Sequence, residues 1–590
     1  MYRAPIDDIK HALFDIAGLR EVMAHLPEGM LTDDLVEAIL AEAGRFAGEE
    51  IAPLARAGDE TGSKVENGAV TTPPGWKELY AKWREGGWNS ISSPEKYGGQ
   101  GLPASLAMAV LEMWNSASMA FAIGPTLTSG AVEALERHAS EELKRKYIAR
   151  MVSGEWMGTM NLTEPQAGSD LGALRTRAEP RGDGTYRIFG QKIFITYGEH
   201  DFTDNIIHLV LARLPDAPPG TKGISLFLVP KFLVNDDGSL GARNDVFCAS
   251  LEKKMGIHGS PTCTMIYGDG KFGDEPGAIG WLVGEPNRGL NCMFTMMNAA
   301  RLAVGIQGVG VAEAARQKAI AYAKERRQGR APGAPTRDMS PIIEHPDVQR
   351  MLLSMTVLTQ ASRAIAYACA QAGDLARWDR ERSNHWQERV NLLTPLAKAF
   401  PTDMGVEVAS LGIQVHGGMG FIEETGAAVL LRDARIAPIY EGTNGIQAID
   451  LVIRKLGLSG GDHVRRFLAE LQADAEQARN TGDDDLAIAG IRAREALHDA
   501  AEAGEYLLGQ LTDGRQEVAL AGATPFLRLM ALAVGGALLV RGATRSGDAA
   551  RAQLARYFAE NHLGDTGALR RVVLEGGDSL LRAAGLLAAM

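Results

Sequence analysis

The sequence predicts an α+β fold, mainly α, in which a small β domain lies between helical domains. Apolar residues recur at three- and four-residue spacing over residues 31–150 and again after residue 285, as they do in amphipathic helices. Between these stretches, short β-branched or aromatic segments are bounded by Gly, Asp and Pro, as strands are. The chain has 590 residues, more than the roughly 250–300 at which a single core stops growing. Several domains are therefore expected.

The first domain, residues 1–160, is predicted to be helical. A Gly/Pro-rich loop over residues 92–103 interrupts its helical pattern. The opening segment MYRAPIDDIKHALFDIAG is mixed in charge and lacks an apolar core, so we expect no cleaved signal peptide.

The second domain, residues 161–285, is predicted to be the β domain. Turn sequences rich in Gly and Asp, at 181–184 and 236–238, separate its segments. The expected strands cover residues 186–189, 193–196, 206–212 and 224–229.

Two helical domains are predicted to follow, a bundle over residues 286–457 and an extra domain over 461–590. In the bundle, the proline-free segment 298–326 places Leu302, Ile306 and Val309 on one stripe. Three or four such segments have the content of a helix bundle. A Gly/Ser-rich break at 458–462 precedes the extra domain.

Charge and hydropathy exclude several classes of partner. The formal net charge is −12, and the extra domain holds 14 Arg, no Lys and 18 Asp plus Glu, a net of −4. No broad basic face for nucleic acid is therefore expected. The apolar run at 529–540 is shorter than the roughly 20 residues that a membrane span needs. It predicts a buried helix, and no integral membrane segment is expected.

The four cysteines are far apart in the sequence. No CxxC pair and no cluster with metal-ligand spacing occurs. We expect free, buried thiols in a reducing cytoplasm and no metal site. The cysteines are Cys248, Cys263, Cys292 and Cys369.

The segment APIYEGTNGIQ, residues 437–447, contains the strongest candidate for a catalytic base. Glu441 follows an apolar Pro-Ile-Tyr and precedes a glycine, which predicts a loop carboxylate with poor access to water. An apolar wall raises the pKa of a carboxyl group, whereas a helix N-terminus lowers it. Asn444 and Gln447 resemble a capping box and predict a helix start just after Glu441. The alternative is a capping glutamate in a surface turn.

Two further stretches are candidates for ligand contacts. In residues 160–170, two small residues precede Ser169, so the backbone could approach a phosphate or carbonyl closely; a polar turn is the alternative. In QVHGGMGF, residues 414–421, the glycines do not follow a strand, and the same is true of Gly308-Val309-Gly310. A dinucleotide fingerprint is therefore rejected for both. Gly417-Gly418 is expected to end a helix, with His416 as a structural cap.

Together these stretches resemble the acyl-CoA dehydrogenase family. The matching motifs occur in the family's order over about residues 160–450, and the loop GGWNSISSPEKYGGQGLP extends the likeness towards the N-terminus. The start MYRAPIDDI and the domain after residue 461 further resemble the long bacterial branch, which includes methylmercaptopropionyl-CoA dehydrogenases and related fatty acyl-CoA dehydrogenases. The motifs are NLTEPQAGSD, KIFIT, the arginine of NAARLAVG, KERRQG, QVHGGMGF and RDARIAPIYEGTNGIQ.

The resemblance implies an FAD cofactor held between the β domain and the bundle. Leu162 and Thr163 match contacts to the flavin ring, and Ser169 matches a serine shared by the flavin phosphate and the pantetheine arm. Phe194 and Thr196 match a residue flanking the flavin and one bonded to it. Many members have tryptophan at the position of Phe194, so the aromatic face is kept without the indole N–H.

The resemblance also assigns residues of the bundle. Those that match contacts to the pyrophosphate, the dinucleotide backbone or a phosphate are Arg326, Gln328, Gln414, Gly417, Gly418 and Thr443. Gln328 stands where many members have a hydroxyl, and some of these contacts often come from a neighbouring subunit. Arg301 matches an arginine near the active-site end of its helix. With Ser169, Arg301 is expected to line the substrate site, as are Tyr440 and Gly442.

The implied reaction is α,β-dehydrogenation of an acyl-CoA, a step of fatty-acid β-oxidation. Glu441 stands at the position of the family's base, which removes the α-proton while the β-hydrogen leaves as hydride to flavin N5. The product is the trans-2-enoyl-CoA. The backbone N–H of Glu441 and a ribityl hydroxyl are implied to stabilise the thioester oxygen. Fatty acyl-CoA and 3-methylmercaptopropionyl-CoA both remain candidate substrates.

Alternative functions and partners follow from the same resemblance. An acyl-CoA oxidase would use the same glutamate and pass electrons to oxygen, whereas a dehydrogenase is expected to reduce electron-transferring flavoprotein. A DNA-associated flavoprotein of this fold would need a basic face, which the net charge of residues 461–590 opposes. A homodimer is expected, because the extra domain would cover the surface of a second dimer contact.

Overall fold

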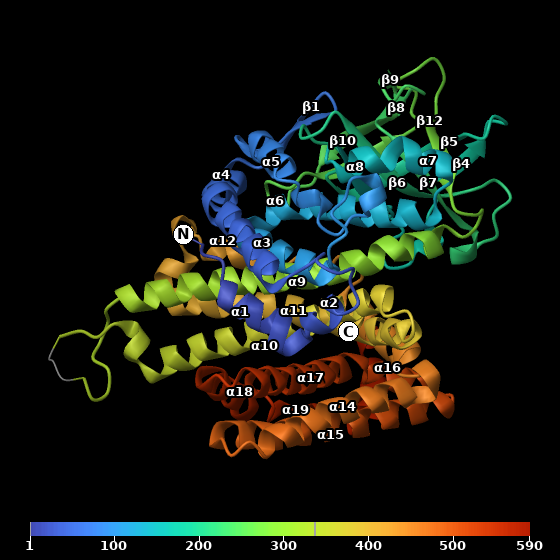
Figure 1. The fold of residues 1–590 in the computed structure, drawn as a ribbon. Coiled ribbons are helices and arrows are strands. Elements are labelled where there is room, and N and C mark those ends of the chain that lie inside the picture. The colour runs from blue at the N-terminus through green and yellow to red at the C-terminus, as the bar shows by residue number, and fades with distance from the viewer. Residues whose placement is uncertain (1, 335–337) are drawn as a thin grey trace. The chain divides into compact units, whose positions relative to one another are not determined.

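The structure is a computed structural model that describes residues 2–334 and 338–590 (Figure 1). The chain forms two compact units. The division falls within two long helices, α6 (Ala104–His138) and α9 (Gly289–Glu325), so each helix contributes to both units. Unit 1 comprises residues 46–102 and 117–300, and unit 2 comprises residues 2–45, 103–116 and 301–590. Helix lies on both sides of a central stretch of strands, which confirms the predicted α+β, mainly α, class.

Unit 1 opens with short helices and a small hairpin that the helical pattern did not predict. The helices are α4 (Ala52–Thr61) and α5 (Trp76–Glu85), and the hairpin pairs β1 (Lys64–Glu66) with β2 (Ala69–Thr71). Its turn is Asn67-Gly68, with φ of 53° and 84°. An Asn-Gly pair at positive φ is typical of the tight turn that joins two antiparallel strands, so the dipeptide was the missed signal.

The main sheet of unit 1 has eight strands in the order β10-β11-β5-β12-β7-β6-β3, with β4 pairing β5 and β6. Most neighbours are antiparallel, but β3 runs parallel to β6. Every residue of β7 is buried, so the middle of the sheet lies in the core. The strands are β3 (Trp156–Asn161), β4 (Arg177–Pro180), β5 (Tyr186–Thr196), β6 (Asn205–Arg213), β7 (Ile224–Pro230), β10 (Val246–Leu251), β11 (Thr262–Tyr267) and β12 (Ala278–Val283).

One strand prediction was wrong in detail. Residues 186–189 and 193–196, expected as two strands, form the single strand β5. Gly190 sits between them at φ 151°, and a Cβ there would lie 2.5 Å from Thr176 Oγ1. The register against β11 shifts nearby. A glycine marks either a turn or a bulge within a strand, and here the chain continues through an irregularity.

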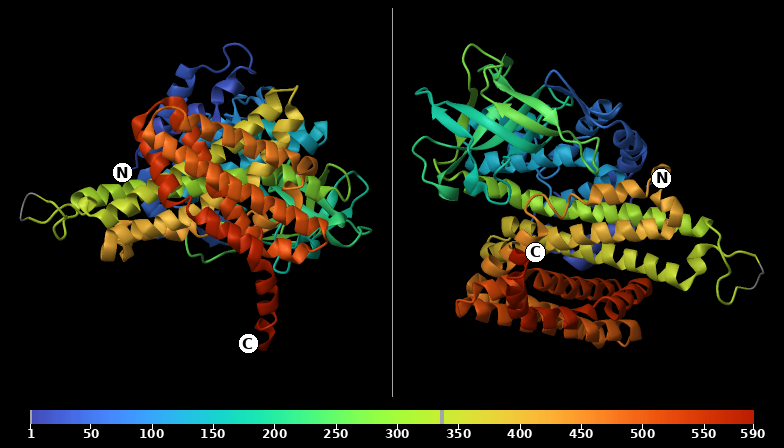
Figure 2. Two further views of the ribbon diagram at one scale, coloured as in Figure 1. Left: turned by 90° about the horizontal axis from the view of Figure 1, so that it is seen from below. Right: turned by 180° about the vertical axis from the view of Figure 1, so that it is seen from behind.

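Unit 2 is a helical assembly built on α10 (Pro346–Trp378) and α11 (Ser383–His416), which pack along each other. Helix α17 (Ala523–Ser546) packs against both of them. Figure 2 shows the C-terminal helices, coloured orange to red, gathered beside α10. The other helices of this unit include α1 (Ile6–His11), α2 (Leu19–Met23), α3 (Asp33–Phe46), α12 (Ala428–Ala434), α13 (Asn444–Asp450), α14 (Asp462–Arg479), α15 (Asp484–Thr512), α16 (Gln516–Ala521), α18 (Ala549–Asn561) and α19 (Asp565–Ala584).

The break predicted at 458–462 is confirmed. A short 3-10 segment (Leu458–Gly461) precedes α14, and Ser459, Gly460 and Gly461 all have positive φ. Positive φ interrupts a right-handed helix, so the chain changes direction here.

Among the residues that the structure describes, two helices are long and apolar enough to cross a membrane by length and composition alone. In α6 and α17, 89% and 83% of the most apolar stretch is buried within the protein. The apolar run at 529–540 belongs to α17, a helix of 24 residues that extends beyond the run at both ends. The predicted burial of the run is confirmed. Burial against other helices is typical of core helices.

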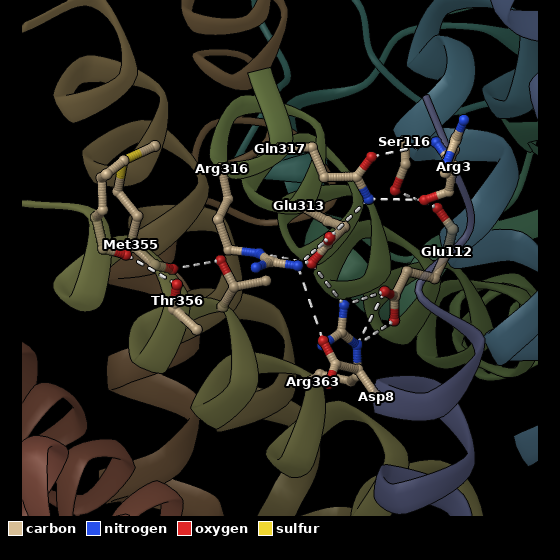
Figure 3. Close-up of polar contacts among 12 residues, drawn as sticks. Arg3, Asp8, Glu112, Ser116, Glu313, Arg316, Gln317, Met355, Thr356 and Arg363 are labelled. Carbon is tan, nitrogen blue, oxygen red and sulfur yellow. Dashed lines mark hydrogen bonds and ion pairs between the residues drawn. The ribbon is translucent and has the colours of Figure 1, made fainter. Parts of the chain in front are cut away.

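A buried charge network joins the N-terminal segment of unit 2 to its long helices (Figure 3). Arg363 on α10 donates from Nη2 to Glu112 Oε1 on α6 (2.6 Å) and to Glu313 Oε2 on α9 (3.0 Å). Tyr367 Oη donates to Glu112 Oε2 at 2.7 Å. Because each charge has a partner, the cost of burying it is offset. The network fixes how α6, α9 and α10 meet within this unit.

Candidate active site

Glu441 lies in a strained turn of unit 2, between α12 and α13. Its φ of 55° is unusual for a residue with a side chain, and Gly442 follows at 85°. The turn is closed by a hydrogen bond from Asn444 N to Pro438 O (3.0 Å) and by Gln447 Nε2, which donates to Glu441 O at 3.3 Å. Strain of this kind costs of order 1–3 kcal/mol and persists where the surroundings enforce it. The turn therefore fixes the position of Glu441.

The helix start predicted just after Glu441 is confirmed, but the capping box was wrong. Thr443 is the N-cap of α13, and its Oγ1 accepts from Ile446 N at 3.2 Å. The side chain of Asn444 instead reaches across to α11. An asparagine amide has donors and an acceptor, so a tertiary partner can compete with the local cap, and the sequence does not reveal that partner.

The carboxyl group of Glu441 has the electrostatics of a base. The residue is half-buried, and loss of solvation raises its pKa to about 6, against the lowering effects of Arg301 and Lys398. Within residues 2–334 and 338–590, no hydrogen bond engages its carboxylate. A base with a pKa near neutrality and no local partner is suited to removing a proton.

Two predicted neighbours of Glu441 are held by buried contacts. Arg301, on α9, is buried and lies 3.9 Å from Asp450 on α13. Burial lowers its pKa, whereas Asp450 and Glu441 act to raise it. The hydroxyl of Tyr440 donates to Gln307 Oε1 on α9, and burial raises the pKa of that hydroxyl. The Tyr440 contact ties the turn to α9, and the Arg301 contact ties α13 to α9.

Lys398 is a neighbour of Glu441 that the sequence reasoning missed. It lies on α11 with no exposed surface, and its Nζ donates to Asn444 Oδ1 at 2.8 Å. Burial lowers its pKa to about 7, and Glu441 and Asp403 oppose that effect. The signal was a lysine inside the apolar helical run Leu-Ala-Lys-Ala-Phe, residues 396–400.

The residues matched to the flavin ring form a separate group in unit 1. Phe194 is 58% exposed at φ 60°, an unusual conformation for an aromatic residue. The carbonyl of Thr163 accepts from Ile193 N at 2.9 Å, and that of Thr196 accepts from Thr159 Oγ1 at 2.8 Å. The first bond joins the backbone of Thr163 to Ile193, the residue that precedes Phe194 in β5.

A buried ion pair anchors this group. Lys192 Nζ lies 2.8 Å from Glu164 Oε1 and also donates to Leu162 O at 2.9 Å. Glu164 further accepts from Thr176 and from the backbone N–H of Arg175. Burial would raise the pKa of Glu164, but Lys192 and these donors outweigh it and lower the value to about 2. The loop after Leu162 is therefore rigidly held, whereas Ser169 is exposed further along it.

Apart from Thr443, the N-cap of α13, the residues matched to phosphate and dinucleotide contacts lie in two other places in unit 2. Gln414 is exposed near the end of α11, and Gly417 is the C-cap at φ 61°, as the helix-ending prediction stated. Arg326 and Gln328 lie in the connection from α9 to α10, where Gln328 O accepts from His345 Nε2 at 2.8 Å.

His416 has a structural environment. Its Nδ1 lies 2.7 Å from Gly412 O, and its ring stacks on Tyr322 with centroids 4.4 Å apart. The predicted role as a structural cap is confirmed. Within the described residues, no group of three or more His, Cys, Asp or Glu side chains is arranged to hold a metal ion.

Four family models match the chain in sequence. They are the N-terminal domain (residues 33–155), the middle domain (159–269) and the C-terminal domain (287–457) of acyl-CoA dehydrogenases, and an acetyl-CoA dehydrogenase C-terminal-like domain (467–584). The matches account for most of the chain.

Known proteins agree with these matches. A 3-methylmercaptopropionyl-CoA dehydrogenase of Ruegeria pomeroyi is 46% identical over 99% of both chains. Among solved structures, Caenorhabditis elegans ACDH-11 in complex with C11-CoA has a TM-score of 0.78 at 22% identity, with 98% of this chain and 96% of that chain covered. An acyl-CoA dehydrogenase complexed with FAD from Bacillus anthracis has a TM-score of 0.74 at 22% identity, with 98% and 93% covered. These two structures share the fold.

The chain belongs to the acyl-CoA dehydrogenase family, and it is an oxidoreductase of that class. The additional C-terminal domain is a match in its own right, and the Ruegeria pomeroyi relative shares it in an end-to-end alignment.

Proposed function

We propose that this protein catalyses the FAD-dependent α,β-dehydrogenation of an acyl-CoA thioester, with Glu441 as the base that removes the α-proton. The observation that carries the proposal is the strained turn that holds a half-buried carboxyl group with a pKa raised to about 6. A surface capping glutamate would be solvated, and capping would hold its pKa down. Glu441 is instead a carboxylate without a hydrogen-bond partner among the described residues.

The backbone of the same turn supports a second role for Glu441. Within the described parts of the chain, its N–H group donates no hydrogen bond. A thioester carbonyl bound there would meet a fixed donor as negative charge develops on its oxygen. One residue would thus take the proton and stabilise the resulting enolate-like charge, with Arg301 and Lys398 as nearby cations.

The residues of unit 1 fit an FAD cofactor. Phe194 offers an exposed aromatic ring, and the residue before it, Ile193, bonds to Thr163 in the loop that Lys192 anchors. We expect Thr196 to bond to the flavin ring and Ser169 to contact the phosphate side of FAD. The residues expected to contact the rest of the dinucleotide are Arg326, Gln328, Gln414, Gly417, Gly418 and Thr443. When bound, FAD supplies the acceptor for the hydrogen and the two electrons that leave the β-carbon.

The favoured substrate is 3-methylmercaptopropionyl-CoA, with a fatty acyl-CoA as the second candidate. The basis is the 46% identity, over 99% of both chains, to a dehydrogenase named for that substrate. Tyr440, Gly442, Arg301 and Ser169 are the residues expected to line the acyl and pantetheine path. The preferred length of the acyl chain depends on the shape of the cavity that holds it, and the sequence motifs do not determine that shape.

The cellular setting follows from the class. Electron-transferring flavoprotein is the expected acceptor, and direct transfer to oxygen, as in an oxidase, is the alternative. All four cysteines are free and buried, which fits a reducing cytoplasm. We propose that the protein forms a homodimer and has no nucleic-acid partner. We further propose that its functional segments are residues 1–160, 161–285, 286–457 and 461–590.

An anaerobic spectral titration with acyl-CoAs tests the function. Purified protein is expected to be yellow and to bleach with 3-methylmercaptopropionyl-CoA or with one length class of fatty acyl-CoA. Glu441→Gln is expected to keep its flavin and to lose turnover by about a hundredfold to ten-thousandfold, because a single positioned base supplies about 10²–10⁴ of rate. Unchanged turnover in this variant would reject Glu441 as the base.

Return of the yellow colour in air without electron-transferring flavoprotein, with oxygen reduced to hydrogen peroxide, would identify an oxidase. Protein that binds no flavin after reconstitution would contradict the proposed cofactor site.

A further inference from the structure

Helix α11 carries one lysine in its buried core. Lys398 has no exposed surface and lies between the buried residues Ala397 and Ala399. A buried ammonium without compensation is costly, so its retention in an apolar stripe calls for a specific partner. That partner is Asn444 Oδ1, at 2.8 Å.

The side chain of Asn444 links the start of α13 to α11 by a group of hydrogen bonds, called the clasp below. Besides accepting from Lys398, its Nδ2 lies 2.7 Å from Asp403 Oδ1, 3.0 Å from Thr402 Oγ1 and 3.1 Å from Ala399 O. All these partners belong to α11. Because Asn444 is three residues after Glu441, the clasp holds the C-terminal end of the catalytic turn in place.

The charged groups around Lys398 come from three elements. They are Glu441 in the turn, Asp403 on the same helix and Arg301 on α9, and each acts electrostatically on the pKa of Lys398. The two carboxylates favour the ammonium form, whereas burial and Arg301 disfavour it. In the opposite direction, Lys398 and Arg301 are the two cations that favour the ionised form of Glu441.

We propose that Lys398, acting through Asn444, is a positioning residue for the reaction: it locks the Glu441 turn onto α11 and keeps the base in its ionised form. The proposal rests on the proposed role of Glu441. It goes beyond that role because it assigns function to a side chain that need not touch substrate or cofactor.

A merely structural lysine and a positioning lysine make different predictions. If Lys398 only fills a buried site, its replacement lowers the stability of the fold. The fall of kcat/KM at acid pH, called the acid limb, then keeps its wild-type midpoint. If it favours the Glu441 carboxylate, its replacement by a neutral residue moves that limb to higher pH. An opposite charge nearby lowers a carboxyl pKa by about 1–3 units, and Arg301 would remain as a second cation. An upward shift of about one unit is therefore expected.

The experiment compares Lys398→Met, Lys398→Arg and the surface control Lys10→Met across pH 5 to 9. Lys10 pairs with Glu37 on the surface of the same unit, so its replacement removes one charge outside the site. We expect the midpoint of the acid limb of kcat/KM to move up by about one pH unit in Lys398→Met. In Lys398→Arg the midpoint should lie close to the wild-type value, and in Lys10→Met it should equal that value. An unmoved limb in Lys398→Met would overturn the proposal.

A second readout does not depend on the bound cofactor. Infrared titration of the flavin-free protein follows the carboxylic-acid band of Glu441, assigned by its loss in Glu441→Gln. Its midpoint is expected to move up in Lys398→Met by the same amount as the kinetic limb. If Glu441→Gln retains turnover, the proposed function fails; if it does not, and both midpoints stay fixed, only the inference about Lys398 fails.

Asn444→Ala tests the clasp and keeps the charge of Lys398. We expect the maximal kcat to fall about tenfold or more, because small displacements of a reacting group cost up to 10² in rate, with less movement of the acid limb than in Lys398→Met. Should Lys398→Met fail to fold, this variant still decides, and a kcat equal to that of the wild type would refute the clasp.

Discussion

At the scale of single residues, the site depends on one strained turn and the charges that face it. Glu441 occupies a positive φ that favours glycine, and its carboxyl group is balanced between burial and two cations. Sequence reasoning found Glu441 from its apolar flank and from the family motif. It did not find Lys398, because a lysine in a helical pattern is usually placed on the solvated face.

The raised pKa of Glu441 makes a prediction about pH. A base acts in its deprotonated form, so kcat/KM should fall about tenfold per unit as pH drops below about 6 and should level off above that value. The measurement is kcat/KM against pH with a non-ionising acyl chain. A limb near the ordinary glutamate value of about 4.3 would contradict the assigned electrostatics.

At the scale of elements, several helix ends are fixed by side chains from distant parts of the chain. The first turn of α6 has no local cap of its own, and Asp374 on α10 accepts from Ala104 N (2.7 Å) and Ser105 N (2.9 Å). Likewise Asn444 joins α13 to α11. Periodicity predicted the helices themselves, whereas these caps depend on which helices meet.

Asp374→Ala is expected to loosen the start of α6. Loss of a capping acceptor costs about 0.5–2 kcal/mol, and two backbone N–H groups lose their partner here. Hydrogen exchange at the amides of Ala104 and Ser105 should become faster by roughly tenfold, with little change in the middle of the helix. The control is Asp216→Ala on an exposed loop. Unchanged exchange would show that these amides do not depend on Asp374.

At the scale of the whole molecule, the C-terminal helices cover part of the bundle. Helix α17 packs on α10 and α11, and α18 packs on α10, so this side of the bundle is occupied within the chain. Exposed apolar side chains gather instead at residues 419–422, where Phe421 is 85% exposed and Met419 and Ile422 are also exposed. Such a patch is typical of an interaction surface.

The covered bundle side and the exposed patch predict a homodimer. Light scattering should give twice the chain mass of 63.1 kDa, and Phe421→Ser should weaken the dimer while Leu35→Ser, another exposed apolar position on α3, should not. A particle of four chains would contradict the predicted state.

The sequence by itself determined the class, the order of helical and β segments, the helix start after Glu441 and the candidate base. These features depend on local periodicity, turn chemistry and ordered motifs, which a linear pattern records. Only the tertiary structure revealed that β5 is one strand, that Thr443 and not Asn444 caps α13, and that Lys398 faces the base. The pairing of β5, the partners that Asn444 finds on α11 and the position of Lys398 all involve residues distant in sequence, and burial, hydrogen bonding and Coulomb attraction act on proximity in space.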